Sequence, residues 1–401
     1  MTSAERRASL GLASIFGLRM LGLFFIMPVF TLYADKLTSA TPLLIGLGLG
    51  AYGLTQAIFQ VPMGMASDRI GRKPIIIGGL VVFAVGSAVA AMSTSIYGVI
   101  IGRALQGCGA IAAAIMALAA DVTRESQRTK IMAFLGISVG VAFMLALIIA
   151  PSIAYYVGLE GIFWATAVLA LVSMCLLFWF VPGRHERSHD REIRPGSLRQ
   201  ALRHPDLIRL DLSVLALHLI LTASFIVLPK VIENSMHVPA SEQWKVYIPV
   251  MLVSAGLLFP AVSMGESKGM MHRLVAAMVI VLAIGELALA DTIHVAPWAI
   301  GVALVVYFTA FNVLESSLPS LVSRFAPVDA KGAALGVFST CQFIGAFLGG
   351  LSGGIVYGHF GVAGTFQFCA VVAVLWFFAV LGLHSPGPQN HQAADSEYTS
   401  A

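Results

Sequence analysis

Ten residues between two long apolar segments carry an unusual density of charge. The stretch Gly64 to Lys73 reads GMASDRIGRK and holds four charges and two glycines. A turn this short needs backbone freedom, which Gly71 supplies, and the carboxylate of Asp68 suits the positive N-terminal end of a helix. The basic side chains suit acidic partners or lipid phosphates. Candidate residues for a conformational switch are therefore Gly64, Asp68, Arg69, Gly71, Arg72 and Lys73, with Asp121 at the end of a later apolar segment. The alternative is a solvated basic loop that serves topology only.

Arg19 is the first ionisable side chain inside an apolar segment, about ten residues from its start. A charge at this depth of a bilayer costs several kcal/mol unless it faces a cavity or a partner. Two interpretations remain open. Arg19 lines a cavity, where it binds substrate or tunes an acid, or it forms a structural pair with a buried carbonyl or carboxylate.

Three more embedded ionisable groups lie in the second half of the chain. Glu315, in FNVLESSLPSL, suits a group that loads a proton on one side of a membrane and releases it on the other, or a hydrogen-bonded structural acid. Histidine has an intrinsic pKa near neutrality, so His218 suits the same task, although a lone histidine among apolar neighbours is commonly a core residue. Glu286 lies close to the end of its segment, and we expect an interfacial carboxylate there.

Composition excludes a water-soluble globule. Of 401 residues, 58% are hydrophobic and 11% are charged, against about 25% charged in soluble domains. The chain is predicted to be an all-α polytopic membrane protein, because about 20 apolar residues cross a bilayer as a helix and the alternating pattern of a membrane barrel is absent. The twelve expected helices span 9–33, 43–65, 74–93, 97–120, 131–156, 161–181, 208–230, 245–264, 273–290, 297–318, 332–357 and 364–384.

The basic residues predict the orientation. Of the 24 Lys and Arg residues, 19 fall in the N-terminal tail and in alternate loops, and the opposite loops hold Lys36, Lys230 and Lys245. The positive-inside rule therefore places both termini in the cytoplasm, with the protein in the inner (plasma) membrane.

A polar, basic stretch divides the expected helices six from six. We expect an N-terminal six-helix bundle at 1–181, a cytoplasmic linker at 182–207, a C-terminal six-helix bundle at 208–386 and a disordered tail at 387–401. Two parallel halves with a shared site between them are a common plan for secondary transporters.

The pattern G-x-x-x-D-R-x-G-R-K in the first charged stretch resembles the signature of the major facilitator superfamily. A second match is R-x-x-Q-G-x-G in the fourth segment, with Arg103 and Gln106, and a third is FNVLESSLPS followed by KGAALGVFSTCQFIG. Together with the RPGS-type linker, these are similar to the YajR-like branch of the drug:proton antiporter family. Known members of that branch carry a C-terminal soluble domain, for which this sequence has no counterpart, so its regulation is not carried over.

The resemblance implies specific roles. It implies that Asp121 joins Arg72 and Asp68 in a charge relay, and that Asp68 approaches the start of the eleventh helix near Gly332. It also associates Arg103 with proton coupling; a brace between the first and fourth helices is the alternative. The candidate residues for proton coupling or a substrate cavity are Arg19, Arg103, Gln106, His218, Asn312, Glu315 and Gln342.

The fifth segment departs from the family's antiporter motif G-x-x-x-G-P-x-x-G-G. Gly136 and Gly140 keep the first spacing, but Val141 replaces the proline. We nonetheless expect alternating-access, proton-coupled efflux of a small amphipathic or drug-like compound, with proton-coupled import of a small polar metabolite as the alternative.

Other classes of function are less well supported by the sequence. A membrane enzyme needs converging catalytic groups, whereas the histidines here are scattered, and a channel or sensor needs a pore or a signalling domain. We expect no cofactor, metal site or nucleotide loop and no nucleic-acid partner. The expected partners are a small-molecule substrate, protons and membrane lipids, with the protein a monomer.

Overall fold

The computed structural model describes residues 3–124, 127–180, 197–291, 296–327 and 330–384. Most of the expected linker at 182–207 and the expected tail at 387–401 lie outside these ranges. Within them the structure is helical, with one isolated bridge between Thr38 and Ser95. The elements are α1 Ser3–Phe24, α2 Phe30–Tyr33, the short 3-10 helix Ala34–Lys36, α3 Pro42–Ile70, α4 Arg72–Ala91, α5 Ile96–Cys108, α6 Ala112–Asp121, α7 Arg128–Phe180, α8 Ser197–Ala201, α9 Pro205–Asn234, the 3-10 helix Ala240–Glu242, α10 Trp244–Ser267, α11 Met271–Ala290, α12 Pro297–Phe325 and α13 Lys331–Val380.

Ten segments of the described chain are long and apolar enough to cross a membrane. Two of them, within α7 and α13, are about twice the length of a crossing and each divides at a glycine with positive φ, Gly158 (φ 68°) and Gly361 (φ 66°). Twelve crossings result, at nearly the positions expected from hydropathy. The all-α membrane fold is confirmed.

The charged stretch at 64–73 is mostly helical, which corrects the expectation of a loop. α3 begins with a side-chain cap, since Leu44 N donates to Thr41 Oγ1 at 3.3 Å, and it continues to Ile70. The chain turns at Gly71 alone (φ 115°), and α4 starts at the next residue. A single residue with a conformation that only glycine adopts readily is enough for this turn.

Two expected helices are interrupted. The first, predicted as 9–33, ends at Phe24 and resumes at Phe30 because Pro28 lacks the N–H that would continue the helical hydrogen bonds. The fourth, predicted as 97–120, is broken between Cys108 and Ala112. At this break the carbonyl oxygen of Gly109 accepts a hydrogen bond from Arg19.

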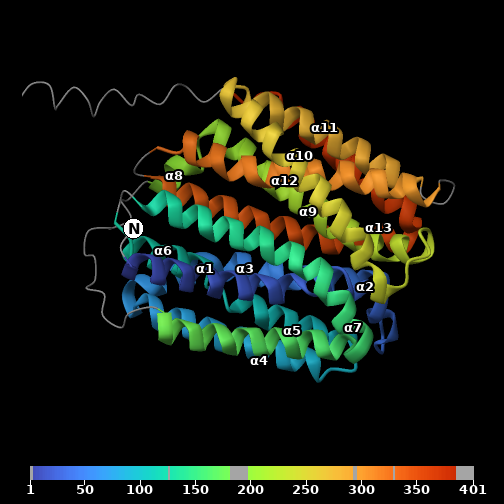
Figure 1. Ribbon diagram of the computed structural model, residues 1–401, viewed down its shortest axis with the longest axis horizontal. Helices are drawn as coiled ribbons and strands as arrows, with labels where there is room; N and C mark the ends of the chain where they lie inside the picture. Colours follow the sequence, from blue (N-terminus) through green and yellow to red (C-terminus); the bar gives the residue numbers. More distant parts are fainter. Residues whose placement is uncertain (1–2, 125–126, 181–196, 292–295, 328–329, 385–401) are drawn as a thin grey trace, which may run out of the picture.

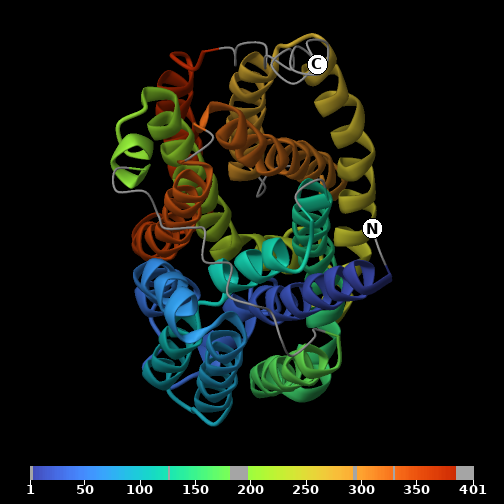
Figure 2. The same ribbon diagram turned by 90° about the vertical axis from the view of Figure 1, so that its left-hand side faces the viewer.

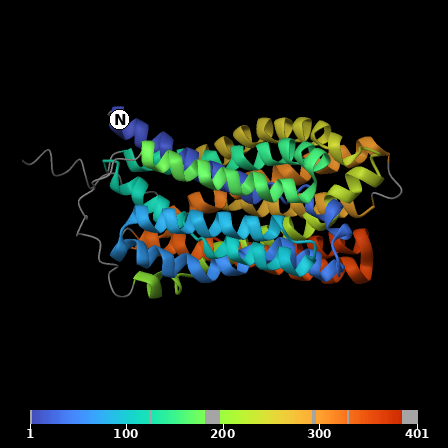
Figure 3. The same cartoon turned by 90° about the horizontal axis from the view of Figure 1, so that it is seen from below.

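The helices run roughly parallel to the long axis in two bundles (Figures 1 and 3). We call the end that carries Gly71 the motif end and the opposite end the far end. Figure 2 looks onto the motif end, with the blue and cyan N-terminal helices below and the orange and red C-terminal helices above. Each bundle has its own set of buried apolar residues, although the C-terminal set also takes in N-terminal residues such as Phe143.

α3 and α13 form the main seam between the bundles. Glycines allow their backbones to touch: a Cβ on Gly350 would lie 2.9 Å from Gly50 N, and one on Gly354 would lie 2.7 Å from Pro42 O. Gln60 of α3 still donates to Ser339 of α13 at 3.1 Å, but one turn closer to the motif end a Cβ on Gly336 would meet nothing within 4 Å. The seam is therefore tight at the far end and open at the motif end.

Candidate functional site

The charged residues at the motif end form a connected group. Arg72 makes an ion pair with Asp68, and its Nε lies 3.3 Å from Asp121 Oδ2. Its Nη1 also donates to Ser67 Oγ at 2.7 Å. The guanidinium therefore joins the end of α3 to the end of α6. Of the other basic candidates, Arg69 is exposed and Lys73 is half-buried.

A second ion pair ties α1 to this end. Arg124 donates to Glu5 from Nε at 2.8 Å and from Nη2 at 3.1 Å. These hydrogen bonds raise the pKa of Arg124 above its usual value, because they favour the charged guanidinium.

Asp68 does not reach α13 in this structure, contrary to the approach to Gly332 that the resemblance implies. Its side chain is 48% exposed, and its ion pair within the described residues is to Arg72. A Cβ on Gly332 would likewise meet nothing within 4 Å. The two groups are apart because the seam between α3 and α13 is open at the motif end, so a contact between them requires a different arrangement of the bundles.

The second half repeats this group with its charges exchanged. Gly269 also has positive φ (62°), and Glu266 just before it accepts from Arg324 Nη2 at 2.7 Å. In the first half the α3–α4 turn supplies the cation and the end of α6 supplies the acid; in the second half the acid and the cation change places. The correspondence supports the internal symmetry of the fold.

Asp68→Asn should weaken the state that is closed at the motif end and slow transport severalfold. A carboxylate at a helix N-terminus contributes about 0.3–2 kcal/mol, and the amide loses most of it. Spectroscopic distances between labels on the two bundles, together with transport rates, would measure the change. Glu266→Gln is the matched control and should have little effect. Unchanged rates and unchanged distances in Asp68→Asn would contradict the switch.

Arg19 lies inside the N-terminal bundle, in line with the structural one of its two interpretations. Its side chain is 0% exposed. Nη2 donates to Tyr52 Oη at 2.9 Å, Gln56 Oε1 at 2.9 Å and Gly109 O at 3.1 Å. Nε and Nη1 are buried without a partner among the described residues. In this conformation Arg19 has a structural role, because its hydrogen bonds hold α1, α3 and the break in helix four together.

Arg103 and Gln106 brace α5 against its neighbours. Arg103 donates to the backbone carbonyls of Gly48 (3.2 Å) and Leu49 (3.3 Å) on α3, and from Nη1 to Gln106 Oε1 (2.8 Å). Gln106 Nε2 in turn donates to Ser87 Oγ at 2.7 Å. The brace joins helices two and four rather than one and four. Its association with proton coupling stays a prediction.

Three candidate residues of the C-terminal bundle meet from three different helices. Gln342 Nε2 on α13 lies 2.7 Å from His218 Nε2 on α9 and 3.4 Å from Glu315 Oε1 on α12. His218 Nε2 is 3.7 Å from Glu315 Oε2. Since the Val214 carbonyl, 3.2 Å from His218 Nδ1, can only accept, Nδ1 carries a hydrogen and Nε2 accepts from Gln342 in the neutral ring. We call these three residues the polar cluster.

The polar cluster is partly accessible. The Glu315 side chain is 37% exposed, whereas the apolar face of α12 around it is buried. Asn312, three residues earlier on the same face, donates to Ser254 Oγ of α10 at 2.7 Å. Carboxylate, imidazole and amide groups in contact can hold a proton or bind a polar ligand, which is the chemistry expected of them from the sequence.

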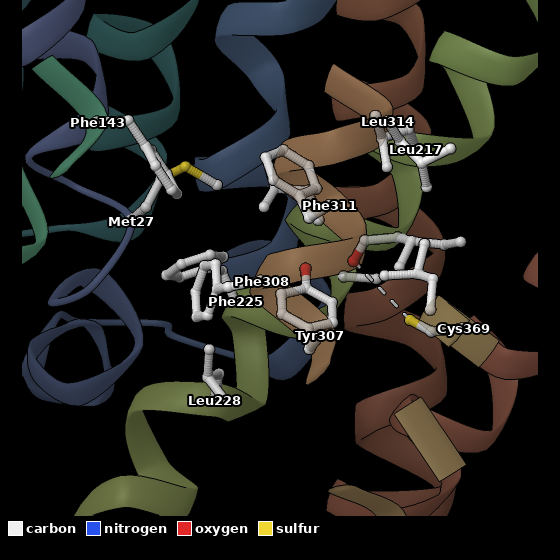
Figure 4. Packing of buried hydrophobic residues seen from close by; sticks show 14 of the residues in the cluster. Met27, Phe143, Leu217, Phe225, Leu228, Tyr307, Phe308, Phe311, Leu314 and Cys369 are labelled. Atoms are coloured by element: carbon white, nitrogen blue, oxygen red, sulfur yellow. Dashed lines mark hydrogen bonds between the residues drawn. The ribbon is translucent and has the colours of Figure 1, made fainter. Parts of the chain in front are cut away.

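Aromatic side chains close the space between the bundles on the far side of the polar cluster (Figure 4). The ring of Phe143, from the N-terminal bundle, lies 6.1 Å from that of Phe225, 6.5 Å from that of Phe308 and 6.3 Å from that of Phe311. The His218 ring in turn lies 6.2 Å from that of Phe311. These four phenylalanines form the aromatic plug. The sequence analysis missed it, although the seven-residue spacing of His218 and Phe225 was a signal.

An ion pair joins the bundles at the far end itself. Lys230 Nζ on α9 donates to Asp35 Oδ2 of the N-terminal bundle at 2.8 Å and to Tyr357 Oη on α13 at 3.3 Å. The ammonium also lies 5.1 Å from the centre of the Tyr357 ring. With the aromatic plug, this contact holds the far end closed.

Glu286 is not an interfacial carboxylate, as the sequence analysis expected. Its side chain is 0% exposed, and Ser224 Oγ donates to its Oε1 at 2.7 Å. The residue lies close to the end of α11, but it points into the bundle rather than toward the membrane surface. Hydropathy places a residue along the helix and leaves its direction around the axis undetermined.

Comparison with known proteins identifies the family. A family model for the Major Facilitator Superfamily matches residues 12–350. The chain belongs to this superfamily. This facilitator is 43% identical over 388 residues to the inner membrane transport protein YajR of Escherichia coli (strain K12), an alignment that covers 96% of the chain and 85% of YajR. The similarity supports the YajR-like branch.

Two further comparisons are informative. The class B tetracycline resistance protein of Escherichia coli is 31% identical over 181 residues, which cover 43% of this facilitator and 44% of that protein. The crystal structure of a D-xylose–proton symporter has the same fold, with a TM-score of 0.77 at 15% identity over 94% of this chain and 98% of that one. The protein is therefore a multi-pass membrane transporter, and its family and structural neighbours are transporters rather than enzymes.

Proposed function

We propose that this facilitator works by alternating access and exports a small amphipathic or drug-like compound in exchange for protons. The observation that carries the proposal is the polar cluster of His218, Glu315 and Gln342. Its imidazole and carboxylate can share one proton. Ligand binding or a change of bundle arrangement alters the affinity of the cluster for that proton. The cluster lies on the motif side of the aromatic plug, which supports proton access from the motif end.

The proposed orientation places the motif end in the cytoplasm, with both termini on that side of the inner membrane. The distribution of Lys and Arg supports it. With this orientation, the contacts between the bundles at the far end support an inward-facing arrangement, from which the proton would be released to the cytoplasm. We further propose the two-bundle division at 1–181 and 208–386 and a monomeric protein in contact with membrane lipids.

The likeness to a tetracycline resistance protein supports a drug-like substrate, although it covers less than half of each chain. The polar cluster beside the phenylalanines of the plug offers both polar and apolar contacts, as an amphipathic compound requires. Val141, in place of the family's proline, weakens the analogy with other antiporters. A symporter of a small polar metabolite could use the same cluster and is the second candidate.

Proteoliposomes with a pH-sensitive dye inside would distinguish the two. Ligands are first selected by thermal shift, beginning with tetracycline, because a compound that binds the folded state raises the melting temperature. The selected compound is then added outside without a pH gradient. Antiport predicts that the lumen becomes alkaline as the compound enters, and symport predicts that it becomes acidic. No change in pH during uptake would refute proton coupling.

Lys230→Met should increase the population that is open at the far end by up to about fivefold. A partly exposed ion pair contributes about 0–1 kcal/mol, and 1 kcal/mol corresponds to roughly a fivefold change in an equilibrium. Distances between spin labels on α2 and α13 would report the change. Lys245→Met is the control, because Lys245 pairs with Glu242 at 2.7 Å within one bundle. Equal distance distributions in both variants would show that the contact between Lys230 and Asp35 does not hold this end closed.

A further inference from the structure

Asp211 is a buried acid that neither the motifs nor the polar cluster explains. It lies on α9, seven residues before His218, which in turn lies seven residues before Phe225. At 100° per residue, each step of seven changes the direction by only about 20°, so the three side chains share one face. Phe225 meets Phe143 of the other bundle on that face. Asp211 is therefore about 10 Å from His218 along the helix, toward the motif end.

The carboxylate of Asp211 lacks the partners of a structural acid. The residue is 9% exposed, and no hydrogen bond or ion pair of its side chain is found in the described part of the chain. The nearby cations are engaged elsewhere: Arg209 pairs with Asp206 at 3.1 Å, and Arg324 on α12 pairs with Glu266 at 2.7 Å. An unpaired acid within a membrane span is costly, and such groups commonly mark proton pathways.

The surroundings of Asp211 connect it to the polar cluster. On α13 the thiol of Cys341 is half-buried and close enough to interact electrostatically with the carboxylate. The next residue, Gln342, contacts both His218 and Glu315. On α9 itself, Val214 lies one turn beyond Asp211 and accepts from His218 Nδ1. Among the described residues, Cys341 of α13 is thus the ionisable group that interacts with Asp211 from a facing helix, and His218 lies about 10 Å away along its own helix.

We propose that Asp211 is a proton-transfer residue that links the polar cluster to solvent at the motif end. The proton leaves the His218 imidazolium or the Glu315 carboxylic acid, passes along ordered water to the Asp211 carboxylate, and leaves from there to solvent. No electrons move, and each group regains its starting state when the next proton arrives. The inference rests on the proposed proton coupling and adds a second group to it.

Cys341 allows a test that needs no substrate. In a background in which Cys108, Cys175 and Cys369 are Ser, a membrane-impermeant methanethiosulfonate added at the motif end should label Cys341. Removing a nearby negative charge favours the reactive thiolate, so Asp211→Asn should raise the labelling rate at neutral pH by at least about threefold. In the protein that keeps Asp211, the labelling rate of Cys341 should also change with pH as Asp211 gains or loses its proton. Asp211→Asn should lack this change. No labelling from the motif end, or identical pH profiles, would overturn the proposal.

Transport supplies the second test. With tetracycline as the probe, or the compound selected by thermal shift, Asp211→Asn should lower pH-driven transport at least tenfold relative to compound exchange, and Asp211→Glu should restore most of it. Asp206→Asn is the control, because that acid is already paired, and its ratio of the two rates should match the wild type. A normal ratio in Asp211→Asn would overturn the inference. If the proposed function is wrong, the wild-type protein moves no protons during transport. The labelling of Cys341 does not depend on that result and tests Asp211 separately.

Discussion

Glu315→Gln is expected to abolish pH-driven transport while compound exchange continues. Glutamine keeps the size and the hydrogen-bonding capacity of the side chain, but its amide cannot gain or lose a proton as a carboxylate does. The contact with Gln342 can therefore persist, whereas the proton shared with His218 has no carboxylate to occupy. We expect a loss of at least about a hundredfold, within the range for removing a positioned acid or base.

The measurement compares two assays on the same proteoliposomes. One follows uptake driven by an imposed pH gradient, and the other follows exchange of labelled for unlabelled compound at equal pH. Glu286→Gln is a matched control, since Glu286 belongs to the same bundle but is enclosed with Ser224 away from the polar cluster. If Glu315→Gln kept pH-driven uptake, the assignment of the proton to the polar cluster would be wrong.

Gly350→Val is expected to disrupt the seam between the bundles and to stop transport. Any Cβ at this position would lie 2.9 Å from Gly50 N and 3.0 Å from Gly50 Cα. Overpacking costs about 1–3 kcal/mol where side chains can adjust, and backbone atoms of α3 adjust less readily. We therefore expect a lower melting temperature in detergent as well as the loss of transport.

A second glycine-to-valine substitution on α13 is the control for the effect of valine on the helix alone. Gly336 lies on the same helix but has nothing within 4 Å of its Cβ position. Gly336→Val should change the free energy of unfolding by no more than about 0.5 kcal/mol, as expected for an open site, so its melting temperature should stay close to that of the wild type. A wild-type melting temperature in Gly350→Val would show that the two helices tolerate separation at this point.

The closed far end has two components that differ in their physical basis. The aromatic plug excludes water through apolar contact, and aromatic pairs of this kind add about 0.5–1.5 kcal/mol each beyond the area that they bury. The ion pair between Lys230 and Asp35 is weaker, because one partner is well exposed. Opening this end therefore depends mainly on separating Phe143 from the three rings of the C-terminal bundle.

The sequence by itself determined the features that depend on local composition. The length of the apolar runs set the number of crossings, since each must span the hydrocarbon and satisfy its backbone internally. The breaks expected between 156 and 161 and between 357 and 364 contain Gly158 and Gly361, where the structure reverses direction. The family resemblance implied a contact between Arg72 and Asp121, which the structure brings together across 49 positions.

The direction in which each embedded polar side chain faces follows from packing between helices. Arg19 and Glu286 turn into their own bundles, whereas His218, Glu315 and Gln342 meet one another. Hydropathy marks all five alike, as polar residues within apolar segments. The break after Phe24 was readable from Pro28, but the second break coincides with a hydrogen bond from Arg19 to Gly109, 90 positions away. Asp211 became informative only when its neighbours were known. Direction around a helix axis and the identity of the facing helix depend on packing between distant segments, and a pattern along one chain does not contain them.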